Sequence, residues 1–230
     1  MDRNSNVYTF IYASGMVILV AAILSLAAIN LKPFQDKNIE IEKKQNILSS
    51  VNIAADATNA EEIYAEKIVN SYIVNSKGEK LEGNAFTVDL KKERAKASDQ
   101  QQLPVFECQI DGDIKYIVPL RGTGLWGPIW GYLALNSDMS TIYGASFDHQ
   151  GETPGLGAEI STQVFQSQFK GKEIYDNGEL VSITVAKSNE TAPEIHKVDA
   201  ISGGTITSKG LQNMISDDLS LYNAFFNQKK

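Results

Sequence analysis

A long uncharged stretch near the N-terminus constrains this chain more than any other feature. Residues Tyr8 to Ile29 are almost all apolar and include no charged side chain. As a helix, this stretch would be about 33 Å long, enough to cross a hydrocarbon core of about 30 Å. It is longer than the apolar part of a usual signal peptide, and Asn30-Leu-Lys-Pro offers no obvious small-residue cleavage site. We therefore predict an uncleaved transmembrane anchor over residues 1–30.

The charges on either side of the predicted anchor bear on its orientation. Arg3 precedes the apolar stretch, whereas Lys32, Lys37, Lys43 and Lys44 follow it. Counted strictly, this distribution favours a cytoplasmic C-terminal domain. Long domains, however, cross the membrane largely regardless of nearby charge, so the count does not decide the side.

Charge and cysteine content exclude several classes of function. The chain of 230 residues has a net charge of −7 and no basic run, which argues against a nucleic-acid partner. Cys108 is the only cysteine, so an internal disulfide and a thiolate metal cluster are both excluded. It lies in an apolar, strand-like run, which favours buried packing. The two histidines, His149 and His196, have no metal-ligand spacing, and we predict no metal site.

The segment after the anchor has helical periodicity. Residues 31–58 are predicted to form a juxtamembrane stalk helix, with Ile41, Ile47, Leu48, Val51 and Ala55 at helical spacing. A second helix is predicted over residues 59–74. Asn59 would cap it, acidic residues would occupy its first turn, and Ser76-Lys-Gly78 would end it.

The middle of the chain has the pattern of a sheet. Strands are predicted at Ala85–Leu90, Val105–Ile110, Ile114–Leu120, Gly127–Leu135 and Thr141–Phe147. Asp111-Gly112-Asp113 is predicted to join two of them as a hairpin turn. Its two acidic residues could also suggest a calcium site, but the other ligands of a calcium-binding loop are missing from the sequence. Lys91 to Gln102 is charged and polar, typical of a solvated loop.

The C-terminal part mixes short elements with one long helix. A short helix is predicted over Ser161–Lys170, with Val164, Phe165 and Phe169 facing inward, and a strand over Leu180–Ala186. The chain would close with a helix from Ser208 to Asn227, whose inner face is Leu211, Met214, Ile215, Leu219, Tyr222 and Phe225. We therefore predict a single transmembrane helix followed by one α+β domain, residues 59–230, with a mainly antiparallel sheet.

One glycine turn stands directly before this last helix. In Asp199-Ala-Ile-Ser-Gly-Gly-Thr, two glycines allow a tight turn and close approach of a ligand to the backbone. A helix start offers unpaired N–H groups and partial positive charge, which suit a phosphate, and would present the Thr205 hydroxyl outward. The alternative is an ordinary turn in which Thr207 or Ser208 caps the helix.

This motif resembles the flavinylation motif of the FMN-binding domain family, in which the corresponding Thr carries FMN through a phosphoester. Gly151-Glu-Thr-Pro-Gly-Leu-Gly157 is similar to that family's other shared motif. Gly122-Thr-Gly-Leu-Trp-Gly-Pro-Ile-Trp-Gly131 is similar to a stretch from one branch, the electron-carrying subunits of a Na⁺-translocating NADH:quinone oxidoreductase. The family usually has Ala at position 204 and often Gly at position 200. A smaller residue at position 204 should not block attachment.

The resemblance implies covalently bound FMN on Thr205, with Ser202, Gly203 and Gly204 forming the attachment turn. It also implies flavin contacts from Glu152, Thr153 and Leu156. Trp126 and Trp130 could each pack in the core or stack on the ring, and we favour Trp126 because it lies in the matching Gly-Leu-Trp. Lys187 could place a positive charge near the phosphate or ring, or be a solvated lysine. An Asx turn is the alternative to a recognition role for Asp199.

The resemblance also implies partners and a location. Threonine is a weak nucleophile and no histidine is placed in sequence to activate it, so a separate flavin transferase is expected to attach the FMN. The other partners would be the remaining subunits of the complex, with the flavin domain on the periplasmic face of the inner membrane. No Gly-x-Gly-x-x-Gly follows a strand, so the subunit should not oxidise NADH alone. The alternatives are a subunit of the related ion-pumping ferredoxin:NAD⁺ oxidoreductase, or an anchored binding or sensor domain without redox chemistry.

Overall fold

The computed structural model describes residues 5–187 and 189–230. Arg3, which enters the orientation argument, lies outside the described residues. The chain divides into two compact units, one up to Lys43 and one from Lys44 to Lys230. Each unit is described by itself.

The first unit is part of a single helix, α1, which spans Asn6–Ser50. Its apolar side chains between residues 7 and 31 are exposed, and it is the one helix in the described part of the chain that is long and apolar enough to span a membrane. Tyr8 and Tyr12 stack near its start. The helix contains Pro33 and continues beyond the apolar stretch, with an ion pair between Lys32 and Asp36. The predicted N-terminal apolar helix is therefore confirmed.

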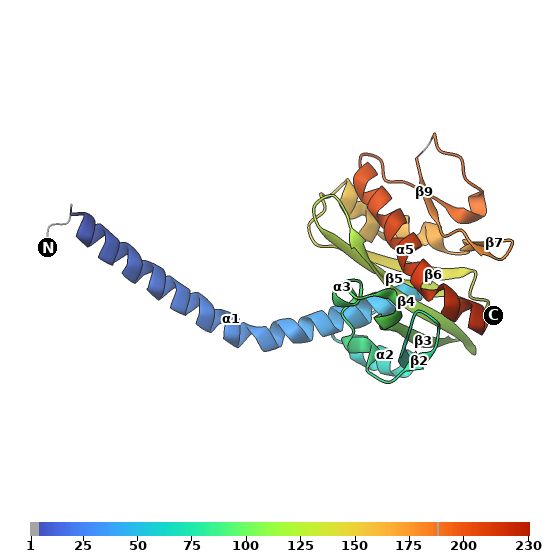
Figure 1. Ribbon diagram of the computed structural model, residues 1–230, viewed down its shortest axis with the longest axis horizontal. Helices are drawn as coiled ribbons and strands as arrows, with labels where there is room; N and C mark the ends of the chain where they lie inside the picture. Colours follow the sequence, from blue (N-terminus) through green and yellow to red (C-terminus); the bar gives the residue numbers. More distant parts are fainter. Residues whose placement is uncertain (1–4, 188) are drawn as a thin grey trace. The chain divides into compact units, whose positions relative to one another are not determined.

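The second unit is built on a six-stranded antiparallel sheet (Figure 1). The strand order is β2-β1-β3-β4-β5-β6, so the four strands from β3 to β6 form a meander in chain order. The hairpin between β3 and β4 turns at Asp111 and Gly112, whose φ values of 51° and 90° are those of a type I′ turn. The strands are β1 (Ile68–Val74), β2 (Lys80–Leu81), β3 (Leu103–Ile110), β4 (Asp113–Thr123), β5 (Pro128–Leu135) and β6 (Ile142–His149).

Short elements and one long helix complete the domain. Two small sheets pair β7 (Tyr175–Asp176) with β8 (Glu179–Leu180), and β9 (Thr184–Ala186) with the parallel β10 (Lys197–Asp199). The α-helices are α2 (Ala60–Lys67), α3 (Leu90–Glu93), α4 (Gln163–Gln166) and α5 (Thr205–Lys229). The 3₁₀ helices are η1 (Ala85–Thr87), η2 (Ser98–Gln100), η3 (Gly157–Ser161), η4 (Ser167–Phe169) and η5 (Glu194–His196).

The larger core lies between the sheet and α5, which crosses one face of it (Figure 1). The predicted inner face of α5 is confirmed, because all six of its residues are buried. Tyr222 is fully covered, and its hydroxyl donates a hydrogen bond to the carbonyl of Pro104 at 2.8 Å. This face of the sheet therefore fixes the position of α5, including its first turn.

A second core lies on the opposite face of the sheet. Ile47, at the end of α1, and Val51 are buried there against Phe106 and Ile117 of the sheet. Cys108 belongs to the same cluster and is fully buried, which confirms its predicted packing role. The sheet is thus covered on both faces by apolar residues.

The structure corrects the prediction for residues 59–90. Only Ala60–Lys67 of the predicted helix over 59–74 is helical, because Ile68–Val74 pairs with β3 as strand β1. Asn59 precedes the helix without a side-chain capping bond, since its amide oxygen accepts from the N–H of Asp56 instead. Ser76-Lys-Gly78 therefore follows strand β1 and forms the turn to β2, and it does not end a helix. The predicted strand Ala85–Leu90 is instead η1 and the start of α3.

Further corrections fall on the loop regions. The predicted solvated loop from Lys91 to Gln102 contains the end of α3 and η2, and Glu93 and Gln101 are buried. In the helical segment after residue 161, Phe165 and Phe169 face the core as predicted, but Val164 is 82% exposed. The predicted strand Leu180–Ala186 is interrupted at Ser182, whose φ is 62°, and divides between β8 and β9.

Candidate functional site

Three segments that are distant in sequence meet at the start of α5. They are the 122–127 loop, which comprises the end of β4 and the connection to β5, the 150–157 loop after β6, and the 201–207 turn that opens α5. A Cβ added to Gly157 would collide with side-chain oxygens of Glu152 and Thr207, and one added to Gly203 would lie 2.6 Å from Leu156 Cδ2. These close approaches require glycine. The three motifs singled out from the sequence therefore form one site.

The turn before α5 leaves the helix start open. Gly203 has a φ of 74°, and the N–H of Gly204 donates to the carbonyl of Ile201 at 3.0 Å, which closes the turn. Gly204 is the N-cap residue, and no side chain caps the helix. Thr205, the first helical residue, is exposed. Unpaired N–H groups and an exposed hydroxyl therefore occur together at the positive end of a 25-residue helix.

The alternative in which Thr207 or Ser208 caps the helix is wrong. The helix begins at Thr205, so both residues lie inside it. The Ser208 hydroxyl accepts from the N–H of Ile201 at 3.1 Å and so ties the helix to the segment before the turn. The Thr207 hydroxyl donates to Glu152 Oε2 at 2.6 Å.

A buried carboxylate joins all three segments. Glu152 is 5% exposed, and its Oε1 accepts from the backbone N–H of Trp126 at 2.8 Å. Its Oε2 accepts from Thr207, as described above. Its own N–H donates to Nδ1 of His149 at 3.2 Å. We call this arrangement of Glu152, the Trp126 N–H and the Thr207 hydroxyl the carboxylate clamp.

Exposed apolar side chains occur on all three converging segments. Trp126 is 68% exposed and Leu125 is 49% exposed, both on the 122–127 loop. Leu156, on the 150–157 loop, is 41% exposed, and Ile206 in the first turn of α5 is 57% exposed. Large apolar groups left in water at one place suit a flat aromatic ligand, and the open helix end suits its phosphate. The residues present therefore fit FMN.

The other predicted contacts lie at the same site with different exposure. Thr153 is exposed, and its carbonyl accepts from the N–H groups of Leu156 and Ala158, which shapes the 150–157 loop. Trp130 is half-buried within β5, whereas Trp126 is 68% exposed, so Trp126 offers more of its surface to a ligand. Ser202 is exposed in the turn.

The parallel pairing of β9 with β10 places Lys187 beside the residues that lead into the Ser202-Gly203-Gly204 turn. Ala186 pairs with Asp199, and its carbonyl accepts from the N–H of Ala200 at 2.8 Å. Lys187 follows directly, and its side chain is exposed. Within the described residues the Asp199 carboxylate accepts no hydrogen bond, so the Asx turn considered from sequence does not form there.

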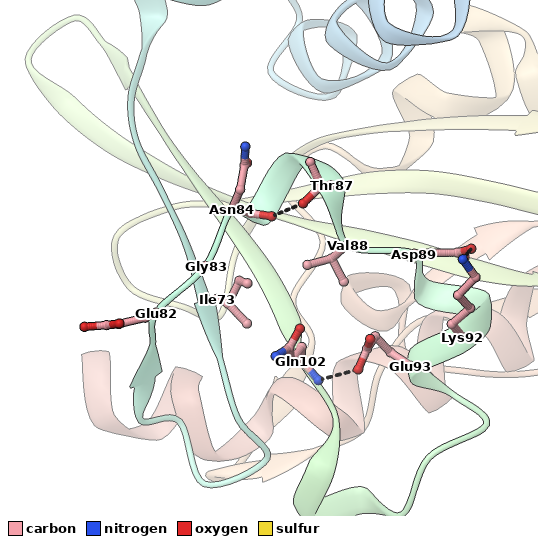
Figure 2. A pocket seen from close by; sticks show the side chains of 10 residues that line it. All are labelled: Ile73, Glu82, Gly83, Asn84, Thr87, Val88, Asp89, Lys92, Glu93 and Gln102. Atoms are coloured by element: carbon pink, nitrogen blue, oxygen red, sulfur yellow. Dashed lines mark hydrogen bonds and ion pairs between the residues drawn. The ribbon is translucent and has the colours of Figure 1, made fainter. Parts of the chain in front are cut away.

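A separate cavity of about 350 Å³ lies near the edge of the sheet. Figure 2 shows Glu93 beside Gln102, whose N–H it accepts at 2.9 Å, and the Thr87 hydroxyl donating to the carbonyl of Asn84. Three carboxylates and a single lysine line it, which does not suit a phosphate. Its lining is Ile73, Glu82, Gly83, Asn84, Thr87, Val88, Asp89, Lys92, Glu93 and Gln102, none of which belongs to the three converging segments.

Sequence reasoning missed Thr207 as a partner of the site. Its spacing relative to Thr205 places it in the same helical turn, but only the fold brings Glu152 to it. Leu125 and Ile206 were also missed. Their signal was available, since both are large apolar residues directly beside motif residues.

Comparison with known proteins identifies the family. The FMN-binding domain family matches residues 124–220. The C subunit of the Na⁺-translocating NADH-quinone reductase of Haemophilus ducreyi is 32% identical over 86% of this chain and 85% of its own length. The corresponding protein of Neisseria meningitidis is 31% identical over 92% of this chain and 88% of its own length.

A solved structure agrees with these relatives. The crystal structure of the C subunit of the Na⁺-translocating NADH-quinone reductase from Parabacteroides distasonis has a TM-score of 0.81 and 48% identity. It covers 85% of this chain and 96% of the solved chain. The chain belongs to the family of C subunits of Na⁺-translocating NADH-quinone reductases. The resemblance to the FMN-binding domain family is thereby confirmed, and every predicted flavin-site residue lies within the range matched to that domain.

Proposed function

We propose that this chain is the FMN-carrying C subunit of a membrane Na⁺-translocating NADH:quinone oxidoreductase. The observation that supports this most directly is the exposed Thr205 hydroxyl at the uncapped start of α5, within a domain of the FMN-binding family. The relatives described above are named as C subunits of Na⁺-translocating NADH-quinone reductases. FMN supplies the electron-accepting and electron-donating chemistry, and no residue of the chain replaces it.

Attachment of the flavin joins Thr205 Oγ1 to the flavin phosphate. With FAD as donor, the pyrophosphate bond breaks, AMP leaves, and the threonine proton is released, without any change of oxidation state. Within the described residues no imidazole hydrogen-bonds the Thr205 hydroxyl, and a threonine hydroxyl is a weak nucleophile. A separate flavin transferase therefore carries out the step.

The residues around Thr205 have distinct roles in holding the flavin. The N–H groups of the first turn of α5, with the turn Ser202-Gly203-Gly204, hold the phosphate. Trp126 and Leu156 cover the apolar ring, and Thr153 serves its polar edge. The Lys187 ammonium provides positive charge, which favours the reduced, anionic ring. Glu152 acts from beneath this surface, through the carboxylate clamp.

The electron path follows from the place of this protein in the complex. The flavin accepts an electron that originates in NADH oxidation and passes it on toward quinone through other subunits. The chain lacks a dinucleotide-binding loop of its own, so it carries electrons without oxidising NADH alone. The α1 helix anchors it in the inner membrane, with the flavin domain on the periplasmic side.

Intact-mass measurement tests the attachment. The mass of the chain taken from its own membrane should exceed the mass of its amino acids alone. The difference should equal the mass of one FMN minus one water. The Thr205→Ala chain, made beside the flavin transferase, should have only the amino-acid mass and show no flavin fluorescence in a denaturing gel. Thr191→Ala is the matched control, because it removes an exposed threonine hydroxyl outside the three converging segments and should keep the covalent mass. Covalent flavin on Thr205→Ala would refute this attachment site.

A further inference from the structure

The Glu152 carboxylate is buried without a charged partner. It is 5% exposed, and within the described residues no lysine, arginine or histidine forms an ion pair with it. Each oxygen accepts a hydrogen bond, from Trp126 N–H and from Thr207, which is the pattern of an ionised carboxylate. A buried anion held only by neutral donors calls for an explanation, because burial of charge is costly.

The start of α5 supplies the compensating electrostatics. Thr207 is the third residue of the helix, so the carboxylate lies at its first turn, where the helix dipole favours negative charge. This is the same helix end that would hold the flavin phosphate. The other donor belongs to Trp126, whose exposed ring is part of the surface offered to the flavin.

From this geometry we propose that Glu152 is a positioning residue that also lowers the reduction potential of the flavin. The clamp fixes the backbone of Trp126 relative to the first turn of α5, so the ring-binding surface and Thr205 keep one arrangement. A buried negative charge beneath the surface that would hold the flavin would oppose the addition of an electron to it. This inference rests on the function proposed above. It differs from a direct flavin contact, since both Glu152 oxygens are engaged by protein donors.

Three variants separate charge from position. Glu152→Gln keeps the shape and removes the charge, so the midpoint potential of the covalently loaded chain should move to a more positive value. Glu152→Asp keeps the charge and shortens the side chain, so the potential should stay near that of the wild type. Asp217→Asn is the control, because it removes a charge from the same helix outside the clamp and should leave the potential unchanged.

A second measurement uses chain made without the flavin transferase. Amide hydrogen exchange at Trp126 should be at least about tenfold faster in Glu152→Asp and in Thr207→Val than in the wild type, because the clamp is loosened in both. Thr207→Ser, which keeps the hydroxyl, should restore slow exchange. The exchange measurement still tests the positioning role if Glu152→Gln does not fold, because Thr207→Val leaves the carboxylate in place.

The outcomes are distinct. A Glu152→Gln potential no more positive than that of Asp217→Asn, or an equal shift in Glu152→Asp, would overturn the electrostatic role. Unchanged Trp126 exchange in both clamp variants would overturn the positioning role. Wild-type chain without covalent flavin would instead refute the proposed function, while the exchange measurement would still decide whether the clamp positions Trp126.

Discussion

At the scale of single residues, the buried carboxylate of Asp218 connects several elements outside the site. It lies on the inner side of α5 and is 2% exposed. Its Oδ1 accepts from Arg94 Nη2 at 2.5 Å, and its Oδ2 accepts from the N–H of Arg121 at 2.8 Å. Arg121 is in β4, just before the 122–127 loop. Asp218 therefore joins α5, β4 and the segment after α3.

The pKa of Asp218 predicts a pH dependence of stability. Burial raises this pKa from 3.8 to about 6, with Arg94 and the Arg121 N–H acting in the opposite direction. Between these values the folded chain holds a proton that the unfolded chain has released, so the free energy of unfolding falls as the pH rises from about 4 to about 6. Two pKa units correspond to about 3 kcal/mol.

Denaturant unfolding in detergent at several pH values measures this effect. The Asp218→Asn chain should lack the fall between pH 4 and pH 6 that Asp218 contributes in the wild type. Asp176→Asn, at an exposed position away from Asp218, should keep the wild-type dependence. Identical pH profiles for the wild type and Asp218→Asn would contradict the prediction.

At the scale of elements, apolar periodicity predicted the strands and the helix whose formation depends mainly on their own sequence. The four strands β3 to β6 and α5 have long, regular apolar periodicity, and their predicted positions agree with the structure within a few residues. The helix predicted for residues 68–74 does not agree with the structure. Ile68, Val69, Tyr72, Ile73 and Val74 fit either a helical face or a strand, and only pairing with β3 makes them β1.

The candidate site divides in the same way. The glycines and the Thr205 hydroxyl are encoded in a short motif, so they were predictable from the sequence. The clamp and the Arg94–Asp218 pair join side chains separated by 55 and 124 positions, and no local pattern encodes such contacts. A polar residue on the apolar face of α5 was the available hint for Asp218.

The end of α1 is an element whose packing can be tested. Leu48 is fully buried, so Leu48→Ala should lower the free energy of unfolding by about 2–5 kcal/mol, through lost contacts and a residual cavity. Ile39→Ala is the matched control on the same helix. Ile39 is 62% exposed, and this change should alter stability by less than about 0.5 kcal/mol. Denaturant unfolding checks both, and equal effects would show that the end of α1 does not belong to the domain core.

At the scale of the whole molecule, the proposed periplasmic location of the domain can be tested by labelling. Cys108 is 0% exposed, so the native chain should react little with a maleimide and give low background labelling. In spheroplasts, Glu179→Cys should react with a membrane-impermeant maleimide, since residue 179 is exposed in the second unit. Ser5→Cys, on the other side of the apolar stretch, should react only after the membranes are opened. The reverse pattern would place the domain in the cytoplasm, as the lysine count favours.

If α1 is the proposed membrane anchor, Pro33 favours a bilayer surface near residue 29. Proline has no N–H, so the carbonyl of Ile29, four residues earlier, lacks its donor within the helix. In hydrocarbon an unmatched carbonyl costs several kcal/mol, whereas at the headgroup level water hydrates it. Ile29 is also where the apolar run ends, and the Asn30 amide beside it already donates to the carbonyl of Leu26 at 2.8 Å. In the proposed anchor, hydration of the helix backbone is therefore expected to begin within about one turn of residue 29.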